Sequence, residues 1–388
     1  MVLSFLLPTL LPVVLASPAF ADSEPTHVEM PNAGNSEATQ PLSILGLSAD
    51  DTLTFGGRIM FDVATGGFDD EEDGTEFRRA RIFLKGSAGE GVGYKVQYDF
   101  AGGDADLKDA YITYANTPLG KIKVGHFKEP FGLDQQTSSK YITFMERNLG
   151  DALSPGRNAG VLFSGNGEAV NHTWALGYFR ESDSYGYEQG DGAGALTGRV
   201  TAAPILDEDR VLHLGLAVRS ASAGTSFSTR PEAHLSTRKA KSNAIGSHKR
   251  LGLESAWVSG PLSVQAEFAQ VDVDDSDETF TSHYLAGSYF LTGESRPYKK
   301  SAAAFDRVKP ITPYGKDGGL GAIELTARVS SIDLEDSAGD AVDDLTLGVN
   351  YYLSSHSRIM VNYIDTDFTD NSVEESADML LFRFQVDF

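Results

Sequence analysis

The polarity of this chain alternates residue by residue through sixteen segments, and no other feature restricts its possible folds as much. Such alternation places polar side chains on one face of a β-strand and apolar side chains on the other. Gly, Asp, Asn and Ser separate the segments, as turns between strands require. The sixteen predicted strands lie near residues 52–63, 75–87, 91–102, 106–116, 119–128, 158–166, 170–181, 194–204, 210–221, 249–260, 261–273, 280–293, 319–332, 343–353, 357–368 and 377–388.

The connections between these segments also follow a pattern. An even number of strands, with short turns at the periplasmic end and long loops outside, is typical of bacterial outer-membrane barrels. Short connections include 88–90 and 260–261, whereas long acidic connections, expected outside, lie at 64–74, 182–193, 222–248, 274–279, 294–318, 333–342 and 369–376. The sequence therefore predicts an all-β fold, a sixteen-stranded antiparallel transmembrane β-barrel. The alternative is a secreted β-sandwich, but sixteen long segments are too many for one sandwich.

One segment, EFRRARIFLK at residues 76–85, shows what the two faces of the wall would contact. Arg79, Arg81 and Lys85 share one parity, while Ile82 and Leu84 share the other. In a barrel that spans a bilayer, the apolar parity faces lipid and the charged parity faces the lumen. The pattern therefore predicts cations inside the barrel. A strand edge protected by charge is the alternative reading of Arg78 to Arg81.

The beginning of the chain reads as a targeting segment followed by a linker. Residues 1–21 contain an apolar run from Val2 to Leu15 and then Ala19-Phe20-Ala21, which together are typical of a secretory signal peptide. No Lys or Arg precedes the run, which leaves the true start codon open. Residues 22–50 are polar and are expected to form a flexible periplasmic lead-in, and residues 51–388 the barrel.

Composition and motifs exclude several classes of function. The chain has 388 residues, a formal net charge of -23 and no Cys. A nucleic-acid-binding protein requires a basic surface, and zinc ribbons, disulfide frameworks and cysteine nucleophiles require thiols. Nucleophile-elbow, zinc-protease and P-loop motifs are missing from the sequence, so neither an enzyme nor a cofactor or metal site is expected.

The parity that faces the lumen carries more positive than negative charge. Thirteen basic residues fall on it, namely Arg58, Arg79, Arg81, Lys85, Lys95, Lys121, Lys123, Arg199, Arg219, Arg250, Arg328, Arg358 and Arg383. Seven acidic residues share that parity, namely Asp62, Asp99, Asp109, Glu254, Glu267, Glu324 and Asp387. His213 is also expected in the lumen, where it would tune conductance with pH. Most of the negative charge of the chain must therefore lie in the loops.

The connection between the fifth and sixth strands is unusually long. Residues 129–157 contain Lys140, Arg147 and Arg157 together with Phe131, Tyr141 and Phe144. Long loops within a compact fold are usually functional. We expect this third external loop, with 130–157 as the constriction segment, to fold inward and narrow the pore. An alternative is that Arg147 is neutralised by its neighbour Glu146 and only holds the loop.

Several stretches resemble one known family. FRRARIFLKG, KDAYITY and GHFKEPFGLDQQTSSKYITFMER are similar to the phosphate-selective porin O and P family, and the likeness extends over nearly all of the mature chain. The resemblance implies a homotrimeric outer-membrane channel that conducts anions past a ladder of Arg and Lys. It assigns that role to Arg79, Arg81, Lys121 and Lys123 on the wall and to Lys128, Lys140, Arg147 and Arg157 in or beside the loop.

Together, parity and resemblance predict a passive porin for small anions of the phosphate class. Arg58, Lys85 and Arg199 join the predicted pathway because their parity points them into the lumen. The wall is expected to contact outer-membrane lipid and lipopolysaccharide. The strongly acidic loops leave two alternatives open, a general or cation-preferring porin and a non-conducting barrel that acts as an adhesin or envelope anchor. Lys121 and Lys123 have a further reading as residues of the periplasmic rim.

Overall fold

The computed structural model describes residues 51–68, 72–118, 120–190, 193–274, 276–334, 340–370 and 373–388. The predicted signal peptide and lead-in lie outside these residues. Within the described residues, no helix is both long and apolar enough to span a membrane.

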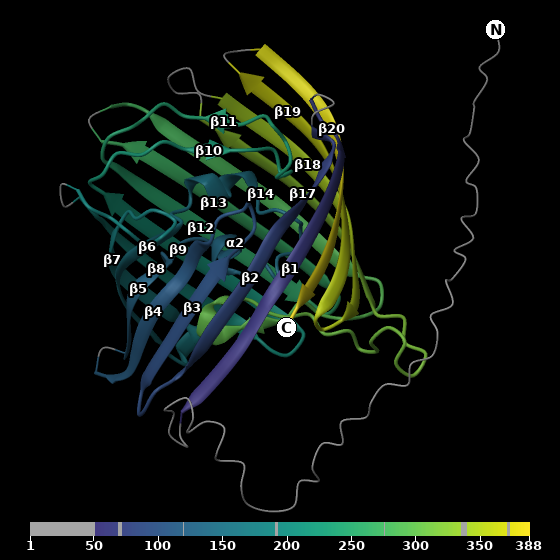
Figure 1. Ribbon diagram of the computed structural model, residues 1–388, viewed down its shortest axis with the longest axis horizontal. Coiled ribbons are helices and arrows are strands. Elements are labelled where there is room, and N and C mark those ends of the chain that lie inside the picture. Colours follow the sequence, from purple (N-terminus) through teal and green to yellow (C-terminus); the bar gives the residue numbers. More distant parts are fainter. Residues whose placement is uncertain are drawn as a thin grey trace, which may run out of the picture.

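The described strands form a closed antiparallel barrel in which sequence neighbours pair and the first strand closes on the last (Figure 1). The predicted all-β barrel of sixteen strands is therefore confirmed. Its strands are β1 (Thr52–Gly66), β2 (Gly74–Ser87), β3 (Val92–Asp99), β4 (Asp106–Thr117), β5 (Gly120–Lys128), β6 (Arg157–Asn166), β7 (Thr173–Arg180), β8 (Ala195–Leu206), β9 (Arg210–Ala221), β12 (His248–Ser259), β13 (Leu262–Val273), β14 (Thr279–Phe290), β17 (Ala322–Asp333), β18 (Asp340–Ser354), β19 (Ser357–Asp370) and β20 (Val373–Asp387).

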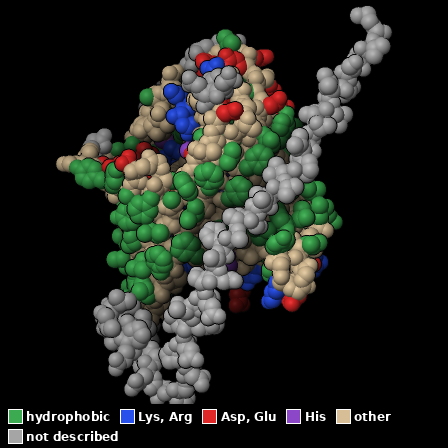
Figure 2. Space-filling view, turned by 45° about the vertical axis from the view of Figure 1, so that its right-hand side comes forward, with side chains coloured by type: hydrophobic (Ala, Val, Ile, Leu, Met, Phe, Trp, Pro, Cys, Tyr) green, Lys and Arg blue, Asp and Glu red, His purple; other side chains and the backbone are tan. Residues whose placement is uncertain are grey.

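The faces of the wall follow the parity of the sequence. On β2, Arg79 and Arg81 are buried inside, whereas the outward side chains of Ile82 and Leu84 are 41% and 40% exposed. The same outward exposure of apolar side chains continues around the barrel, and Figure 2 shows it as a broad hydrophobic band with acidic side chains above it. Such a band is typical of transmembrane barrels, in which alternate residues of each strand face the bilayer.

One irregularity changes what β2 presents to the lumen. The register between β1 and β2 shifts between Met60 and Phe61, because Met60 pairs with Arg79 while Phe61 pairs with Phe77. Arg78 is therefore the extra residue of a β-bulge, and such bulges re-aim side chains. As a result both Arg78 and Arg79 reach the lumen side of this strand.

Two connections fold into the barrel from the end with the long loops. The first, residues 129–156, contains the short helix α2 (Leu133–Gln136) and the 3-10 helix η2 (Leu149–Leu153), and Figure 1 shows α2 inside the ring of strands. The second, residues 222–247, contains the short pair β10 (Ser228–Thr229) and β11 (Ala240–Lys241). Its Glu232 is buried and accepts a hydrogen bond from Thr346 of the wall at 2.6 Å.

The prediction that 294–318 is an external loop was wrong. The connection between β14 and β17 lies at the end that also holds the Ser354–Ser357 turn and the C-terminus, since Tyr314 N donates to Leu353 O at 2.8 Å. It contains β15 (Tyr298–Lys299), η4 (Lys300–Ala302) and β16 (Ala304–Phe305). Strand direction alternates, so the connections at 260–261, 274–279 and 291–321 must alternate between the two ends, and length was the misleading signal. The remaining short helix, η3 (Ala169–Asn171), lies in the turn between β6 and β7.

Candidate anion pathway

The loop at 129–156, which we call L3, is attached to one half of the barrel wall. Its backbone exchanges hydrogen bonds with wall side chains at Ile142, Thr143, Met145, Leu149 and Leu153. The wall partners are Arg358 (2.9 Å), Asn350 (2.7 Å), Asn362 (2.8 Å), Ser330 (3.1 Å) and Arg250 (2.9 Å), all on β12, β17, β18 and β19. The L3 backbone therefore lies against the β12–β20 half of the wall, and L3 reaches β1 and β2 through side chains, in the Ser139–Arg58 and Glu146–Arg78 contacts.

The first turn of L3 is also held by a wall carboxylate. Glu267 on β13 accepts hydrogen bonds from the amides of Leu133 and Asp134, at 2.7 and 2.8 Å, which are the first residues of α2. Phe144, Met145, Leu149 and Leu153 are buried and supply the apolar contacts of the loop. The apolar and polar anchors together fix the position of L3 inside the barrel.

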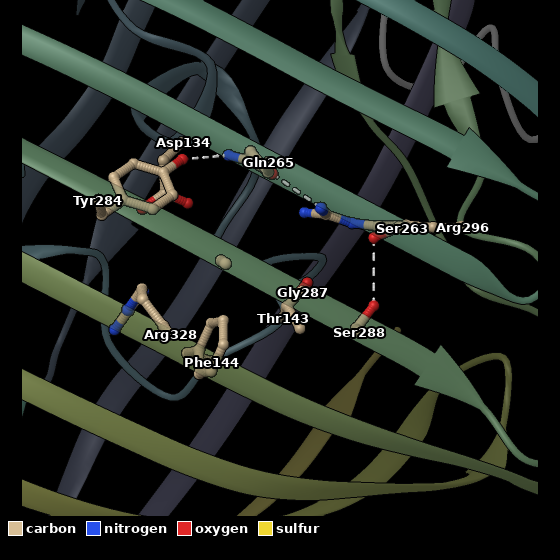
Figure 3. Close-up of a pocket in the computed structure, with 11 residues that line it drawn as sticks. Asp134, Thr143, Phe144, Ser263, Gln265, Tyr284, Gly287, Ser288, Arg296 and Arg328 are labelled. Carbon is tan, nitrogen blue, oxygen red and sulfur yellow. Dashed lines mark hydrogen bonds between the residues drawn. The ribbon is translucent and has the colours of Figure 1, made fainter.

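The lumen behind L3 is nearly filled. Figure 3 shows Gln265, Arg296 and the Ser263–Ser288 pair around a pocket between L3 and strands β13 and β14. The cavity there has a volume of about 20 Å³, close to the smallest space that holds one water molecule. This space is therefore too small for a solute larger than water.

The other half contains a cavity of about 410 Å³ between L3 and the wall. Nine basic side chains line it: Arg58, Arg78, Arg79, Arg81, Lys95, Lys123, Lys128, Arg147 and Arg157. Only two carboxylates do so, Asp109 and Asp151. The cavity thus concentrates positive charge in a chain whose total charge is strongly negative.

Some of these cations are neutralised by partners. Asp109 binds both Lys95, at 2.5 Å, and Arg157, at 2.9 Å. Arg81 is paired at 2.6 Å with Asp99, a residue that does not itself line the cavity. These pairs fix the side chains and reduce the charge that they offer to a solute.

Four cations face the cavity without any carboxylate partner among the described residues. Arg58 donates to the hydroxyl of Ser139 at 2.5 Å, and Lys128 donates to the carbonyl of Gln135. Lys123 lies over the rings of Tyr111 and Phe127, with its ammonium 4.8 Å from each centroid. Arg79 is 6% exposed and makes no hydrogen bond or ion pair within the described part of the chain. Burying an unpaired cation is costly, so these groups favour an anion between them.

The structure answers the question about Glu146 and Arg147. Glu146 binds Arg78 at 2.7 Å and Arg383 at 2.8 Å, and so it does not neutralise Arg147. Burial alone raises the pKa of Glu146, but Arg78 and Arg383 outweigh this effect and hold that pKa well below its ordinary value. Arg147 instead donates to two carbonyls of L3 and lies 3.7 Å from Asp151.

Seven of the eleven predicted pathway residues line the cavity, and four lie elsewhere. Lys85 and Lys121 are exposed near the periplasmic ends of β2 and β5, so Lys121 lies at the rim, as the alternative interpretation had it. Lys123 lies deeper and lines the cavity. Lys140 is bound to Asp387 at 3.1 Å. Arg199 is buried on β8, is paired with Glu254 at 2.7 Å and donates a hydrogen bond to the carbonyl of Ala303 at 2.9 Å.

Two lining cations were outside the predicted pathway. Lys95 was counted on the lumen parity but not assigned to the pathway, and Arg78 has the wrong parity for an uninterrupted strand. A signal for Arg78 was present, because two polar residues separate the outward-facing Phe77 and Ala80, as a bulge allows. His213 does face inward, but it is fully buried and bonded to Tyr298 at 2.7 Å.

A second cavity adjoins this site on the side of the connection at 222–247. It has a volume of about 360 Å³ and is lined by residues of L3 and of the connection at 222–247. Gln135, Arg147 and Asp151 line both cavities, so these side chains lie at the boundary between them. Burial raises the pKa of Asp151 above that of an ordinary aspartate. Among the described residues, no group of three or more potential ligand side chains is placed to bind a metal ion.

Comparison with known proteins identifies the family. The family model described as Phosphate-selective porin O and P matches residues 53–388. Porin O of Pseudomonas aeruginosa is 30% identical over an alignment that covers 86% of this chain and 88% of that protein. An anion-selective porin from Comamonas acidovorans has a similar fold, with a TM-score of 0.57 at 15% identity over 87% of this chain and 100% of that chain.

The outer membrane channel DcaP of Acinetobacter baumannii also has this fold, with a TM-score of 0.57 at 13% identity over 88% of this chain and 99% of that chain. The family match identifies a channel of the bacterial outer membrane rather than an enzyme. By the extent of the match and by its identity to Porin O, the chain belongs to the phosphate-selective porin O and P family.

Proposed function

We propose that this porin passes small anions of the phosphate class down their concentration gradient, through the cavity between L3 and strands β1–β6. The observation that carries the proposal is the set of four cations, Arg58, Arg79, Lys123 and Lys128, that face this cavity without a carboxylate partner. An oxyanion supplies what these groups lack, because guanidinium binds two oxygens of a phosphate at once.

The remaining lining suits an oxyanion with several acceptor oxygens. The hydroxyl-bearing residues Ser138 and Ser139 lie at the cavity on the L3 side. Rings of Arg and Lys are the usual lining of anion and phosphate pores. The description of the matching family and the name of the Comamonas protein agree with this chemistry.

The acidic exterior favours a second candidate, a general or cation-preferring porin. The chain carries 55 acidic against 32 basic residues, and exposed carboxylates at the mouth repel anions at long range. Screening limits this repulsion to about 8 Å at physiological ionic strength, whereas the cavity cations lie against the solute. Local charge should therefore decide the selectivity.

Planar-bilayer recording separates these candidates. With a KCl gradient across the membrane, the reversal potential of an anion-selective channel takes the sign of the chloride equilibrium potential. Added phosphate then reduces the chloride current if the two anions compete for the cavity. A potassium-like reversal potential would reject anion selectivity, absence of current steps would favour the envelope anchor, and lack of block would reject a phosphate site.

We also propose that the barrel assembles as a homotrimer in contact with lipid and lipopolysaccharide. The support is the family membership together with the outward apolar band. The mass of the detergent-solubilised protein, measured by light scattering with a correction for detergent, tests the trimer directly.

A further inference from the structure

The connection between β14 and β17, residues 291–321, has an inner and an outer part. The inner part enters the lumen, where Arg296 and Phe305 are buried and the guanidinium of Arg296 lies 3.5 Å from the centre of the Phe305 ring. The outer part, residues 309–321, leaves the lumen after the buried Val308 and is mostly exposed. We call this outer part the periplasmic flap, and in Figure 1 it belongs to the light-green segment at the lower end of the barrel.

The flap is a defined structure, because its own backbone closes it. Gly315 N donates to Gly319 O at 3.1 Å, and Gly321 N donates to Thr312 O at 3.1 Å. Gly315 and Gly318 adopt φ values of 75° and 77°, which glycine reaches without strain. A third bond, from Tyr314 N to Leu353 O at 2.8 Å, attaches the flap to the end of β18. Its backbone is therefore held in a defined conformation, which sets the side of the flap from which each side chain projects.

Despite this order, the flap exposes large apolar side chains. Leu320 and Ile311 are 71% and 69% exposed, the highest values for large hydrophobic side chains among the described residues, and Tyr314 is 61% exposed. A turn at the periplasmic end that faced only water would more often carry small polar residues. This combination indicates that another apolar phase covers the flap.

The flap continues the lipid-facing band of the barrel. The ring of Tyr314 packs edge-on against that of Tyr351, with centroids 6.3 Å apart. Tyr351 has the outward parity of β18, the same as the exposed Leu347 and Val349. On β14, the strand from which this connection departs, the outward Tyr289 is 46% exposed near the same end of the barrel. The flap thus lies on the outer side of the wall, directly below a surface that already contacts lipid.

We propose that the periplasmic flap inserts Ile311, Tyr314 and Leu320 into the headgroup region of the periplasmic leaflet. Tyr side chains favour this depth because the ring enters the apolar layer while the hydroxyl stays hydrated. Lys309 and Lys316 are exposed on the same segment and outnumber its one carboxylate, Asp317, so their ammonium groups match the phosphates of phospholipids. Continuity with the lipid-facing wall and this charge complementarity select a lipid surface as the occupant. The contact is additional to those of the strands and is independent of which solute the channel carries.

Site-directed spin labelling tests the proposal, since the chain has no Cys to interfere. Leu320→Cys carries the test label on the full-length protein in liposomes of phosphatidylethanolamine and phosphatidylglycerol. Leu347→Cys, on the outward wall, is the matched lipid control, and Asp317→Cys, at the tip of the flap, is the matched water control. Collisions of the nitroxide with oxygen report lipid, and collisions with a water-soluble nickel chelate report water.

The expected result is that the label at position 320 collides more with oxygen than with nickel, as at position 347, while the label at 317 shows the reverse. A label at 320 that behaves like the one at 317 would place the flap in water and overturn the proposal. Low accessibility to both reagents would also overturn it, because the flap would then be covered by protein, as in a contact with a second copy. Heat-dependent mobility in SDS gels confirms that each labelled variant is folded before the comparison.

Discussion

Replacement of Arg79 by Ala is the most direct test of the cationic cavity. Arg79 is buried, lines the cavity and makes no ion pair among the described residues, so its charge acts on whatever occupies the cavity. A sphere with the cavity volume of about 410 Å³ has a radius of about 4.6 Å. With the length of the guanidinium added, the charge of Arg79 lies about 8 Å from an anion at the centre. At an effective dielectric constant of about 20, this distance gives an attraction of about 2 kcal/mol for one negative charge.

An attraction of about 2 kcal/mol corresponds to about a 30-fold change in affinity. Counter-ions in the lumen screen part of it, so we expect Arg79→Ala to raise the phosphate concentration that halves the chloride current by about 10-fold. Bilayer recording at neutral pH and fixed KCl concentration measures this quantity. The reversal potential in a KCl gradient should also move toward the potassium value.

The same substitution should not weaken the fold. The ion pairs of the neighbouring residues, Arg78 with Glu146 and Arg81 with Asp99, remain, and the variant removes a buried charge that had no partner. Arg210→Ala is the matched control, because Arg210 is exposed at the first residue of β9 and its only ion-pair partner among the described residues is Asp207. If phosphate halves the chloride current of Arg79→Ala at the same concentration as in the wild type and in Arg210→Ala, Arg79 does not act on the permeating ion and our assignment of the pathway is wrong.

Three further predictions concern L3 and the acidic surface. The pKa of Asp151 is raised, so this carboxylate becomes neutral at a higher pH than an ordinary aspartate, and anion conductance should rise on mild acidification. Asp151→Asn should show the higher conductance already at pH 7. Bilayer recording at several pH values measures both effects. Glu146→Gln leaves Arg78 and Arg383 without their shared partner and should cost about 3 kcal/mol, measured as earlier loss of the folded form on heating in SDS. The pKa of Glu146 is depressed, so its contribution to stability is complete above the ordinary glutamate pKa and is lost only as the pH falls through the lower pKa of the folded state. The difference in stability between wild type and variant should therefore be the same at pH 5 as at neutral pH. Lowering the salt from 1 M to 10 mM extends the screening length from about 3 to about 30 Å, and anion selectivity should therefore decrease at low salt if the acidic loops act on the mouth.

Much of the fold could be predicted from the sequence, because a strand in a membrane barrel has only two faces. Each predicted strand overlaps an observed one, and Arg79 and Ile82 lie on the expected sides. Parity alone does not record a bulge, which is how the contribution of Arg78 was missed. Nor does length identify the end of the barrel at which a connection lies, as residues 294–318 demonstrate.

The candidate site was harder to predict than the fold, since it depends on pairing between distant segments. Arg199 and Arg79 have the same inward parity, but Arg199 is bound by Glu254, which lies 55 residues away in the sequence. Lys140 is on the predicted constriction loop, yet Asp387 near the C-terminus holds it away from the cavity lining. The sequence indicates which cations face inward, whereas the tertiary contacts determine which of them remain available to a solute.

The attachment of L3 to one side explains how an acidic protein can present a basic passage. L3 fastens its backbone to β12, β17, β18 and β19, and residues behind it pair their charges with one another, as Arg328 does with Glu232. A charge paired in this way has little effect on an ion passing on the other side of the loop. The space that L3 leaves open adjoins β1–β6, where basic residues outnumber carboxylates by nine to two. The sign of the selectivity therefore follows from where L3 is anchored, because that anchorage decides which wall the solute meets.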